Sequence, residues 1–261
     1  MTTAAVGVRP AYSPRMWVYG VATIAAVAVI AEHLRSHFAP GSLGHHQMAG
    51  MPGMAGVPET HTAAMSLAWL WMWWVVMTAA MMLPLAAGEA DRIAAASLWG
   101  RRHVAVIEHL ACYLAVWSVF GLAAIWVVDV VWPSGVPAAA PVLALLSAAM
   151  WQVTGLRKRA FRRCGRPTYI NVRGWRADRD CVIAGVSYGR RCLITCAPVM
   201  AVMALAHSAL LMVALAILLF TERAPGPNPA RRPGRPLEAV LLVGMAVGLG
   251  LWGVLGRGHL P

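Results

Sequence analysis

The chain has 261 residues, of which 59% are hydrophobic and only 12% are charged. A typical soluble domain has roughly 45–50% apolar residues and about twice this share of charged ones. So few charged side chains cannot cover the surface of a soluble protein of this length, and the same figures exclude disordered, collagen-like and coiled-coil proteins. The composition therefore predicts an all-α protein that crosses a membrane several times.

Basic residues outnumber acidic ones by 22 to 10, which gives a formal net charge of +12. In a soluble protein such an excess can indicate nucleic-acid binding. Here the arginines lie between apolar runs, and no helix is left over to enter a groove. We therefore expect no nucleic-acid partner, and we interpret the basic segments as cytoplasmic loops that face anionic lipid.

A first apolar run covers residues 16–31 and follows Arg9 and Arg15. The run ends without a convincing cleavage site, so we predict a membrane helix at 16–31 rather than a signal peptide, with a cytoplasmic N-terminus at 1–15. Residues 32–62 are rich in Gly, Pro, His and Met and have no helical periodicity. They are predicted to form a flexible extracytoplasmic loop.

The rest of the chain, residues 63–261, is predicted to be a helical bundle in the inner membrane. Apolar runs occupy 65–87 and 104–131, and a shorter one occupies 138–154. Residues 155–180 carry nine cations against two aspartates and are predicted to be a cytoplasmic loop. A second basic cytoplasmic loop is predicted at 221–236, where Glu222 is expected to pair with an arginine, and a last span at 237–255.

The stretch at 181–220 decides the number of spans. Its uncharged part, residues 192–220, would form about 43 Å of helix at 1.5 Å per residue, against a hydrocarbon core of about 30 Å. Both flanking segments are basic and should lie inside, which requires an even number of crossings. We therefore predict two helices that break near 205–208, and seven spans in all; a single tilted helix would give six.

The predicted outer loop is dense in imidazole and thioether groups. It holds five of the nine histidines of the chain, and methionine is unusual in a solvated Gly/Pro loop because it normally fills cores. Thioethers select Cu(I), and imidazoles accept Cu(I) or Cu(II). The loop is therefore predicted to capture copper, unless it is an ordinary low-complexity segment; its candidate ligands are His33, His37, His45, His46, Met48, Met51, Met54 and His61.

Further soft donors lie along the predicted membrane helices. Met77 and Met81 are one turn apart on one face of the second helix. On a later helix, one side carries Cys192, Cys196 and Met200, with Met203 continuing the stripe. Together with His207, the residues Met77, Met81, Cys192, Cys196 and Met200 form a candidate inner path for a soft metal. The alternative is that these side chains only pack between helices.

Two ionisable residues, Glu108 and His109, open the third predicted span. Ionisable groups in a membrane helix are costly and are therefore candidates for function, here as harder metal ligands. They could also sit at the cytoplasmic interface. The chain has no nucleotide-binding, phosphorylation or hydrolase motif, so we do not expect ATP-driven pumping.

Several motifs follow one another between Trp73 and Arg223. They are Trp73 or Trp74 with Met77-Thr-Ala-Ala-Met81-Met82-Leu-Pro84, Gln152 to Leu156 with Lys158, Cys164-Gly-Arg166-Pro167, Gly185, Gly189, Cys192, Cys196, Met200, Met212 and Glu222-Arg223. This order resembles a bacterial family of predicted metal-binding integral membrane proteins of unknown function, some of whose members are labelled copper chaperones. The chain departs from the family pattern at Ala160, Thr195, Ala197 and His207-Ser208.

We predict from these features a multi-pass membrane protein that binds or handles a soft transition metal, namely copper, for delivery, transport or storage. Its expected partners are the lipid bilayer and a copper-dependent membrane enzyme or another copper chaperone. An enzymatic activity of its own is not expected. Two alternatives stay open: a component of a membrane-embedded metal-dependent oxidase or oxygenase, with Glu108, His109 and His207 as ligands, and a structural subunit of a membrane complex.

Overall fold

The computed structural model describes residues 14–38, 59–133, 135–137, 139–164, 171, 174–206, 208–223 and 236–255. Within these residues the protein has helices and no strands, which confirms the predicted all-α class. The helices are α1 (Arg15–Phe38), α2 (Glu59–Ala96), a short 3-10 helix η2 (Trp99–Arg101), α3 (Arg102–Val131), α4 (Ala139–Val153), α5 (Gly155–Cys164), α6 (Trp175–Leu205), α7 (Ala209–Arg223) and α8 (Pro236–Leu255).

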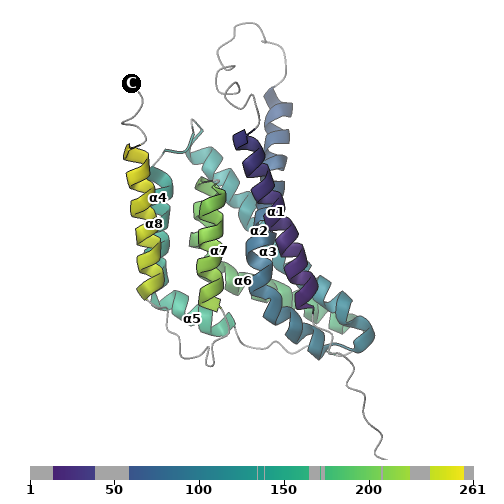
Figure 1. Ribbon diagram of the computed structural model, residues 1–261. Helices are drawn as coiled ribbons and strands as arrows, with labels where there is room; N and C mark the ends of the chain where they lie inside the picture. The colour runs from purple at the N-terminus through teal and green to yellow at the C-terminus, as the bar shows by residue number, and fades with distance from the viewer. Residues whose placement is uncertain are drawn as a thin grey trace, which may run out of the picture.

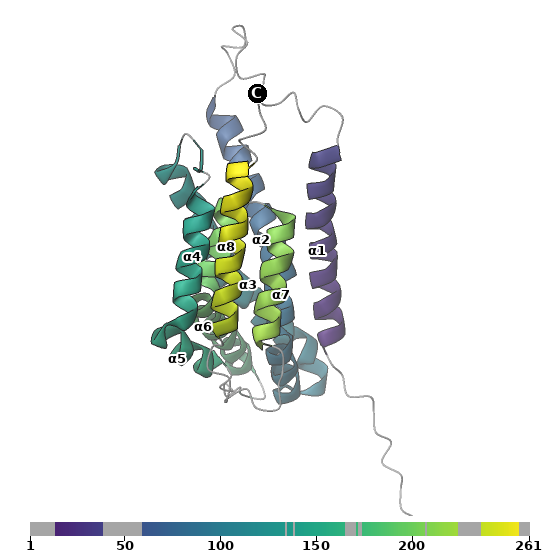
Figure 2. The ribbon, with the colours of Figure 1, turned by 60° about the vertical axis from the view of Figure 1, so that its left-hand side comes forward.

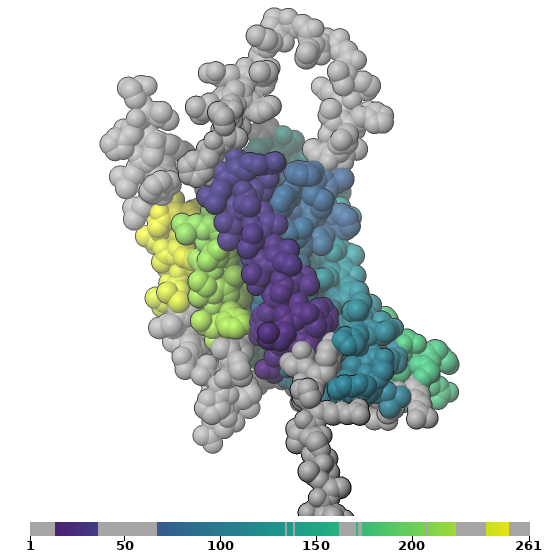
Figure 3. All heavy atoms as spheres, turned by 45° about the vertical axis from the view of Figure 1, so that its right-hand side comes forward, coloured from purple at the N-terminus to yellow at the C-terminus, as the bar shows by residue number. Residues whose placement is uncertain are grey.

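The long helices run side by side, and α5 lies across one end of the bundle (Figures 1 and 2). We call this the lower end, as in Figure 1; α1 ends and α2 begins at the opposite, upper end. Helix α3 packs against both α2 and α6, while α4 packs against α6 and α8. Helix α1 lies on the outside of the bundle against α2 and α7 (Figure 3).

Four of the described helical segments are long and apolar enough to cross a membrane: Arg15–Arg35, Leu67–Ala96, Trp99–Val131 and Trp175–Leu205. Helices α4 and α5 form a fifth candidate that bends by 70° at their junction, and α7 and α8 contain shorter apolar segments. Several helices of this chain could therefore span a membrane. The predicted total of six or seven spans is not confirmed by length and composition.

The predicted break near 205–208 is confirmed. Helix α6 ends at Leu205, where Ala206 takes an extended conformation, and α7 begins at Ala209. The hydroxyl of Ser208 accepts a hydrogen bond from the backbone N–H of Leu211 at 3.5 Å, as a residue preceding a helix often does. This turn lies at the upper end of the bundle.

Both predicted loops contain helical segments, so those two predictions are wrong in part. Helix α1 continues to Phe38 and includes an ion pair between Glu32 and Arg35, one turn apart, and α2 already begins at Glu59. The connection is therefore 39–58 rather than 32–62. In the basic segment 155–180, α5 occupies the first ten residues and α6 begins at Trp175. Hydropathy alone does not identify these helical segments, because they are polar or highly charged.

Two glycines of α6 bring this helix into close contact with α3. A Cβ atom at Gly185 would lie 2.4 Å from the carbonyl oxygen of His109, and one at Gly189 would lie 3.0 Å from Cβ of Val116. Small residues four positions apart allow helix backbones to approach in this way in membranes. The contact therefore places His109 of α3 directly beside Gly185 of α6.

Candidate functional site: a methionine-lined pocket

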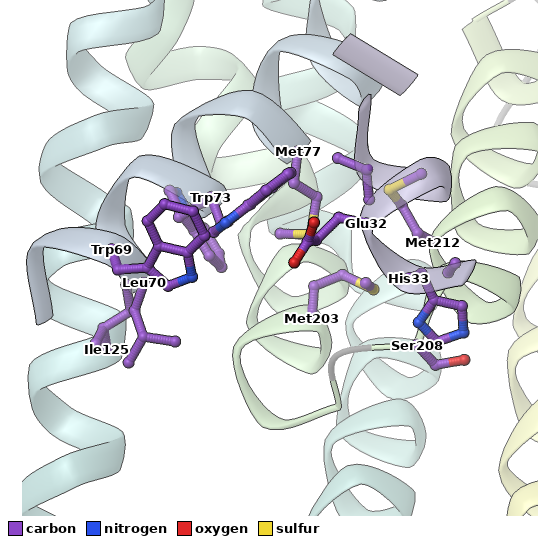
Figure 4. A pocket seen from close by; sticks show the side chains of 13 residues that line it. Glu32, His33, Trp69, Leu70, Trp73, Met77, Ile125, Met203, Ser208 and Met212 are labelled. Atoms are coloured by element: carbon purple, nitrogen blue, oxygen red, sulfur yellow. The ribbon is translucent and has the colours of Figure 1, made fainter. Parts of the chain in front are cut away.

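A pocket of about 320 Å³ lies at the upper end of the bundle and is lined mainly by α1, α2 and α7 (Figure 4). Its surface is mostly apolar, with indole rings from α2 on one wall. The lining residues are Val29, Glu32, His33, Trp69, Leu70, Trp73, Trp74, Met77, Ile125, Met203, Ser208, Ala209 and Met212.

Three thioethers from three different helices meet in this pocket. Met77 comes from α2, Met203 from α6 and Met212 from α7, and all three side chains are buried. In Figure 4 the side chains of Met77 and Met203 and the carboxylate of Glu32 extend toward one another, while Met212 lies on the side of α1 and α7. The α6–α7 turn is what places Met203 and Met212 in the same cavity.

Two polar donors enter the pocket from α1. They are the carboxylate of Glu32 and the imidazole of His33, which lie on consecutive positions near the upper end of this helix. Glu32 also pairs with Arg35, whose Nη2 lies 2.9 Å from Glu32 Oε2. Thioether and imidazole groups together form the donor set that selects copper over harder cations. This combination can therefore hold a soft ion in a cavity with largely apolar walls.

The structure separates the predicted ligands into groups. His33 and Met77 lie in the pocket, as just described. Met203 belongs to the predicted stripe of α6, but Met212 and Glu32 were not predicted as donors. The sequence signals for Met212 are its place in the family motifs and its position one turn after Ser208, which precedes α7.

The other predicted inner donors are buried in the core below the pocket. Met81, Cys192, Cys196 and Met200 are each at most 3% exposed and belong to one continuous hydrophobic cluster with Met77. The four cysteines whose side chains the structure describes are all reduced thiols; they are Cys112, Cys181, Cys192 and Cys196. The Tyr113 hydroxyl lies 3.3 Å from Cys192 Sγ. The predicted stripe of sulfur-containing side chains is thus present on α6. The same side chains also pack in the hydrophobic core between the helices.

Glu108 and His109 do not act together. The carboxylate of Glu108 pairs with Arg101, with 3.1 Å between Arg101 Nη2 and Glu108 Oε2, whereas the side chain of His109 is completely buried. Among the described residues, no three His, Cys, Asp or Glu side chains gather as a metal-binding group.

The remaining predicted ligands cannot be placed at side-chain level. His45, His46, Met48, Met51, Met54 and His207 lie outside the described residues. His37 belongs to the last turn of α1 and His61 to the first turn of α2, so the backbone puts both at the upper end, and their side chains are likewise outside the description. Copper capture by the segment 39–58 therefore stays a prediction.

At the lower end, Arg157 of α5 and Glu222 of α7 form a buried ion pair. This confirms the expectation that Glu222 pairs with an arginine of the basic segments. The guanidinium also donates through Nε to the carbonyl oxygen of Thr195 at 3.3 Å. The Arg157 side chain thus connects α5 with α6 and α7. These last two helices are the ones that carry Met203 and Met212.

A family described as copper chaperone, PpoB2, has a sequence model that matches residues 70–250, which is more than half of the chain. The matched region includes Met77, Met203 and Met212, whereas α1 with Glu32 and His33 lies before it. Comparisons with curated proteins and with solved structures gave no match. The extent of the family match means that this chain belongs to the PpoB2 family of copper chaperones.

Proposed function

We propose that the protein is a membrane-embedded copper chaperone that takes up copper at the upper end of its bundle and passes it to a partner protein. Copper is the cargo in this proposal. The observation that supports it best is the meeting of Met77, Met203 and Met212 with His33 in one pocket. The residues 39–58, which contain His45, His46, Met48, Met51 and Met54, join α1 and α2 at that same end.

The distribution of charge supports an orientation. Arginines are concentrated at the lower end, on α5, on η2 and at the start of α6; examples are Arg101, Arg159 and Arg176. Basic residues favour the cytoplasmic side of a membrane. The pocket and the His/Met segment would then face the extracytoplasmic side. In that oxidising compartment thiols are lost to disulfides, whereas thioethers cannot form disulfides.

The pocket suggests how cargo would move. A soft ion can pass between donors by ligand exchange, in which one donor binds before another leaves, so that the bare ion is never exposed to hydrocarbon. His33 comes from α1, near the upper end of that helix, and Met77 and Met203 come from α2 and α6 and are buried (Figure 4). The sequence of donors therefore runs from imidazole to thioether, which favours the cuprous ion as the transported form. The carboxylate of Glu32 would offset its charge.

Cu(I) titration of the detergent-purified full-length protein tests this proposal. The test protein carries His45→Ala, His46→Ala, Met48→Leu, Met51→Leu and Met54→Leu, so that the segment 39–58 no longer contributes donors; we call it the loop-silent protein. A chromophoric Cu(I) chelator serves as competitor under anaerobic reducing conditions. Adding Met77→Leu and Met203→Leu should remove about one equivalent of bound Cu(I), because leucine has a similar volume but no donor atom.

The matched control is Met150→Leu, a methionine on α4 whose side chain is 69% exposed and remote from the pocket. This control should bind as much Cu(I) as the loop-silent protein. Equal Cu(I) binding by the Met77→Leu/Met203→Leu variant and its parent would contradict the proposal.

A further inference from the structure

His109 is an unusual histidine. Its side chain is completely buried within the bundle, and neither ring nitrogen has a hydrogen-bond partner among the residues that the structure describes. The backbone of Cys181 on α6 is close enough to act on the ring as a weak hydrogen-bonding group, but no partner meets either ring nitrogen with the distance and angle of a full hydrogen bond. Buried polar atoms are almost always fully paired, and water cannot compensate within a membrane. A buried imidazole with only this weak contact is therefore a candidate for binding a ligand.

The surroundings of His109 consist of aromatic rings and a thiol. Its ring centroid lies 5.9 Å from that of Tyr188, which in turn lies 5.4 Å from that of Tyr113. The hydroxyl of Tyr113 is 3.3 Å from Cys192 Sγ, and the hydroxyl of Tyr188 donates to the carbonyl oxygen of Leu85 on α2 at 3.1 Å. We call His109, Tyr113, Tyr188 and Cys192 the His109 cluster. It joins α3 and α6 at the α2 interface.

Buried sulfur atoms lead from the pocket to this cluster. On α6, Met203, Met200, Cys196 and Cys192 follow one another at intervals of three or four residues, and each is at most 1% exposed. Such an interval corresponds to a rise of about 5–6 Å along the helix. The pocket at Met203 and the cluster at Cys192 are thus connected by soft donors that are one helical turn apart.

We propose that His109 is an inner copper-binding residue, to which Cu(I) passes from the methionine-lined pocket along the sulfur atoms of α6. This inference rests on the proposed function and extends it from uptake at the upper end to movement through the bundle. Neutral imidazole donates a lone pair without losing a proton. Each cysteine on the route gives up its thiol proton when Cu(I) binds and takes a proton back when the ion moves on, and copper remains Cu(I) throughout, so the passage needs no net proton and no electron. Cu(I) is a soft ion that accepts both sulfur and imidazole donors.

The test uses the loop-silent protein in the same Cu(I) titration. It should bind about two equivalents of Cu(I), one in the pocket and one at His109. His109→Ala should lower this by about one equivalent, and so should His109→Gln, which keeps the polarity and much of the volume of the side chain. His103→Ala, a change at an exposed histidine on the same helix, is the control and should have no effect.

The outcomes separate the two proposals. If both His109 variants still bind as much Cu(I) as their parent while Met77→Leu/Met203→Leu loses its equivalent, copper stops at the pocket and the inner site is wrong. If the methionine variant also binds as before, the proposed function itself falls. X-ray absorption at the copper edge gives an independent readout on the protein with His109 intact. The second equivalent should add imidazole scattering that is missing from the His109→Gln variant, and identical imidazole scattering in the two proteins would overturn the inference.

Discussion

Arg157 and Glu222 are held together by two contacts of the same guanidinium nitrogen, since Arg157 Nη2 lies 2.5 Å from both Oε1 and Oε2 of Glu222. The side chains are 1% and 7% exposed. Their helices α5 and α7 are separated in the chain by the whole of α6, whose Thr195 carbonyl accepts the third contact. This pair therefore closes the lower end of the bundle, opposite the pocket.

Breaking this pair should strongly destabilise the protein. In Glu222→Ala the Arg157 charge stays buried without its partner, which typically costs about 3–5 kcal/mol. Arg35→Ala is the control, because it removes an exposed partner of Glu32 and such pairs contribute about 0–1 kcal/mol. Thermal unfolding in detergent measures both effects. If the two variants unfold at the same temperature, the ion pair does not hold the lower end together.

The contact of α3 with α6 should tolerate no side chain at Gly185. In Gly185→Ala the new Cβ meets the carbonyl oxygen of His109, which belongs to the backbone and cannot rotate away. Overpacking of this kind costs about 1–3 kcal/mol. At Gly88 of α2 no atom lies within 4 Å of the corresponding position, so Gly88→Ala should be neutral or stabilise by about 0.5–1 kcal/mol. The opposite order of stabilities would refute the close packing of these helices.

The pocket should discriminate between metal ions by softness. Thioethers bind monovalent soft ions and have little affinity for zinc. We expect Ag(I) to displace Cu(I) from the loop-silent protein, and Zn(II) at the same concentration to leave bound Cu(I) unchanged. Release of Cu(I) on addition of Zn(II) would show that harder donors dominate the site.

The orientation of the bundle can be tested by labelling. A cysteine introduced at position 207, between α6 and α7, should react with a membrane-impermeant maleimide only from the extracytoplasmic side. One introduced at Arg159 on α5 should react only from the cytoplasm. Both belong in a chain whose own five cysteines have been replaced. Reaction of position 207 from the cytoplasm alone would invert the orientation or reduce α6 and α7 to one crossing.

Hydropathy and charge were enough to predict most helices and the break between α6 and α7. The break followed from simple physics, because two basic segments on the same side require an even number of crossings. The upper end of α1 is harder to predict, since the apolar run stops at Glu32 while the helix continues to Phe38. Hydropathy alone therefore places the polar last turns of this helix in a loop.

The pocket itself was only partly predictable. The donor atoms of His33 and Met77 mark both residues as candidates from the sequence, whereas their meeting with Met203 and Met212 depends on how four helices pack. Periodicity reports which face of a helix is apolar, and it does not report which other helix covers that face. The unpaired state of His109 was likewise invisible, because a histidine that starts a span is as easily placed at the membrane surface. Its burial follows from the approach of α6 through Gly185.

The central claim is that thioethers of the pocket hold the cargo. X-ray absorption at the copper edge of the loop-silent protein, loaded with one equivalent of Cu(I), tests this most directly. We expect a cuprous edge and scattering dominated by sulfur, which weakens when Met77→Leu and Met203→Leu are introduced. A first shell of nitrogen and oxygen alone, unchanged by these substitutions, would contradict the claim.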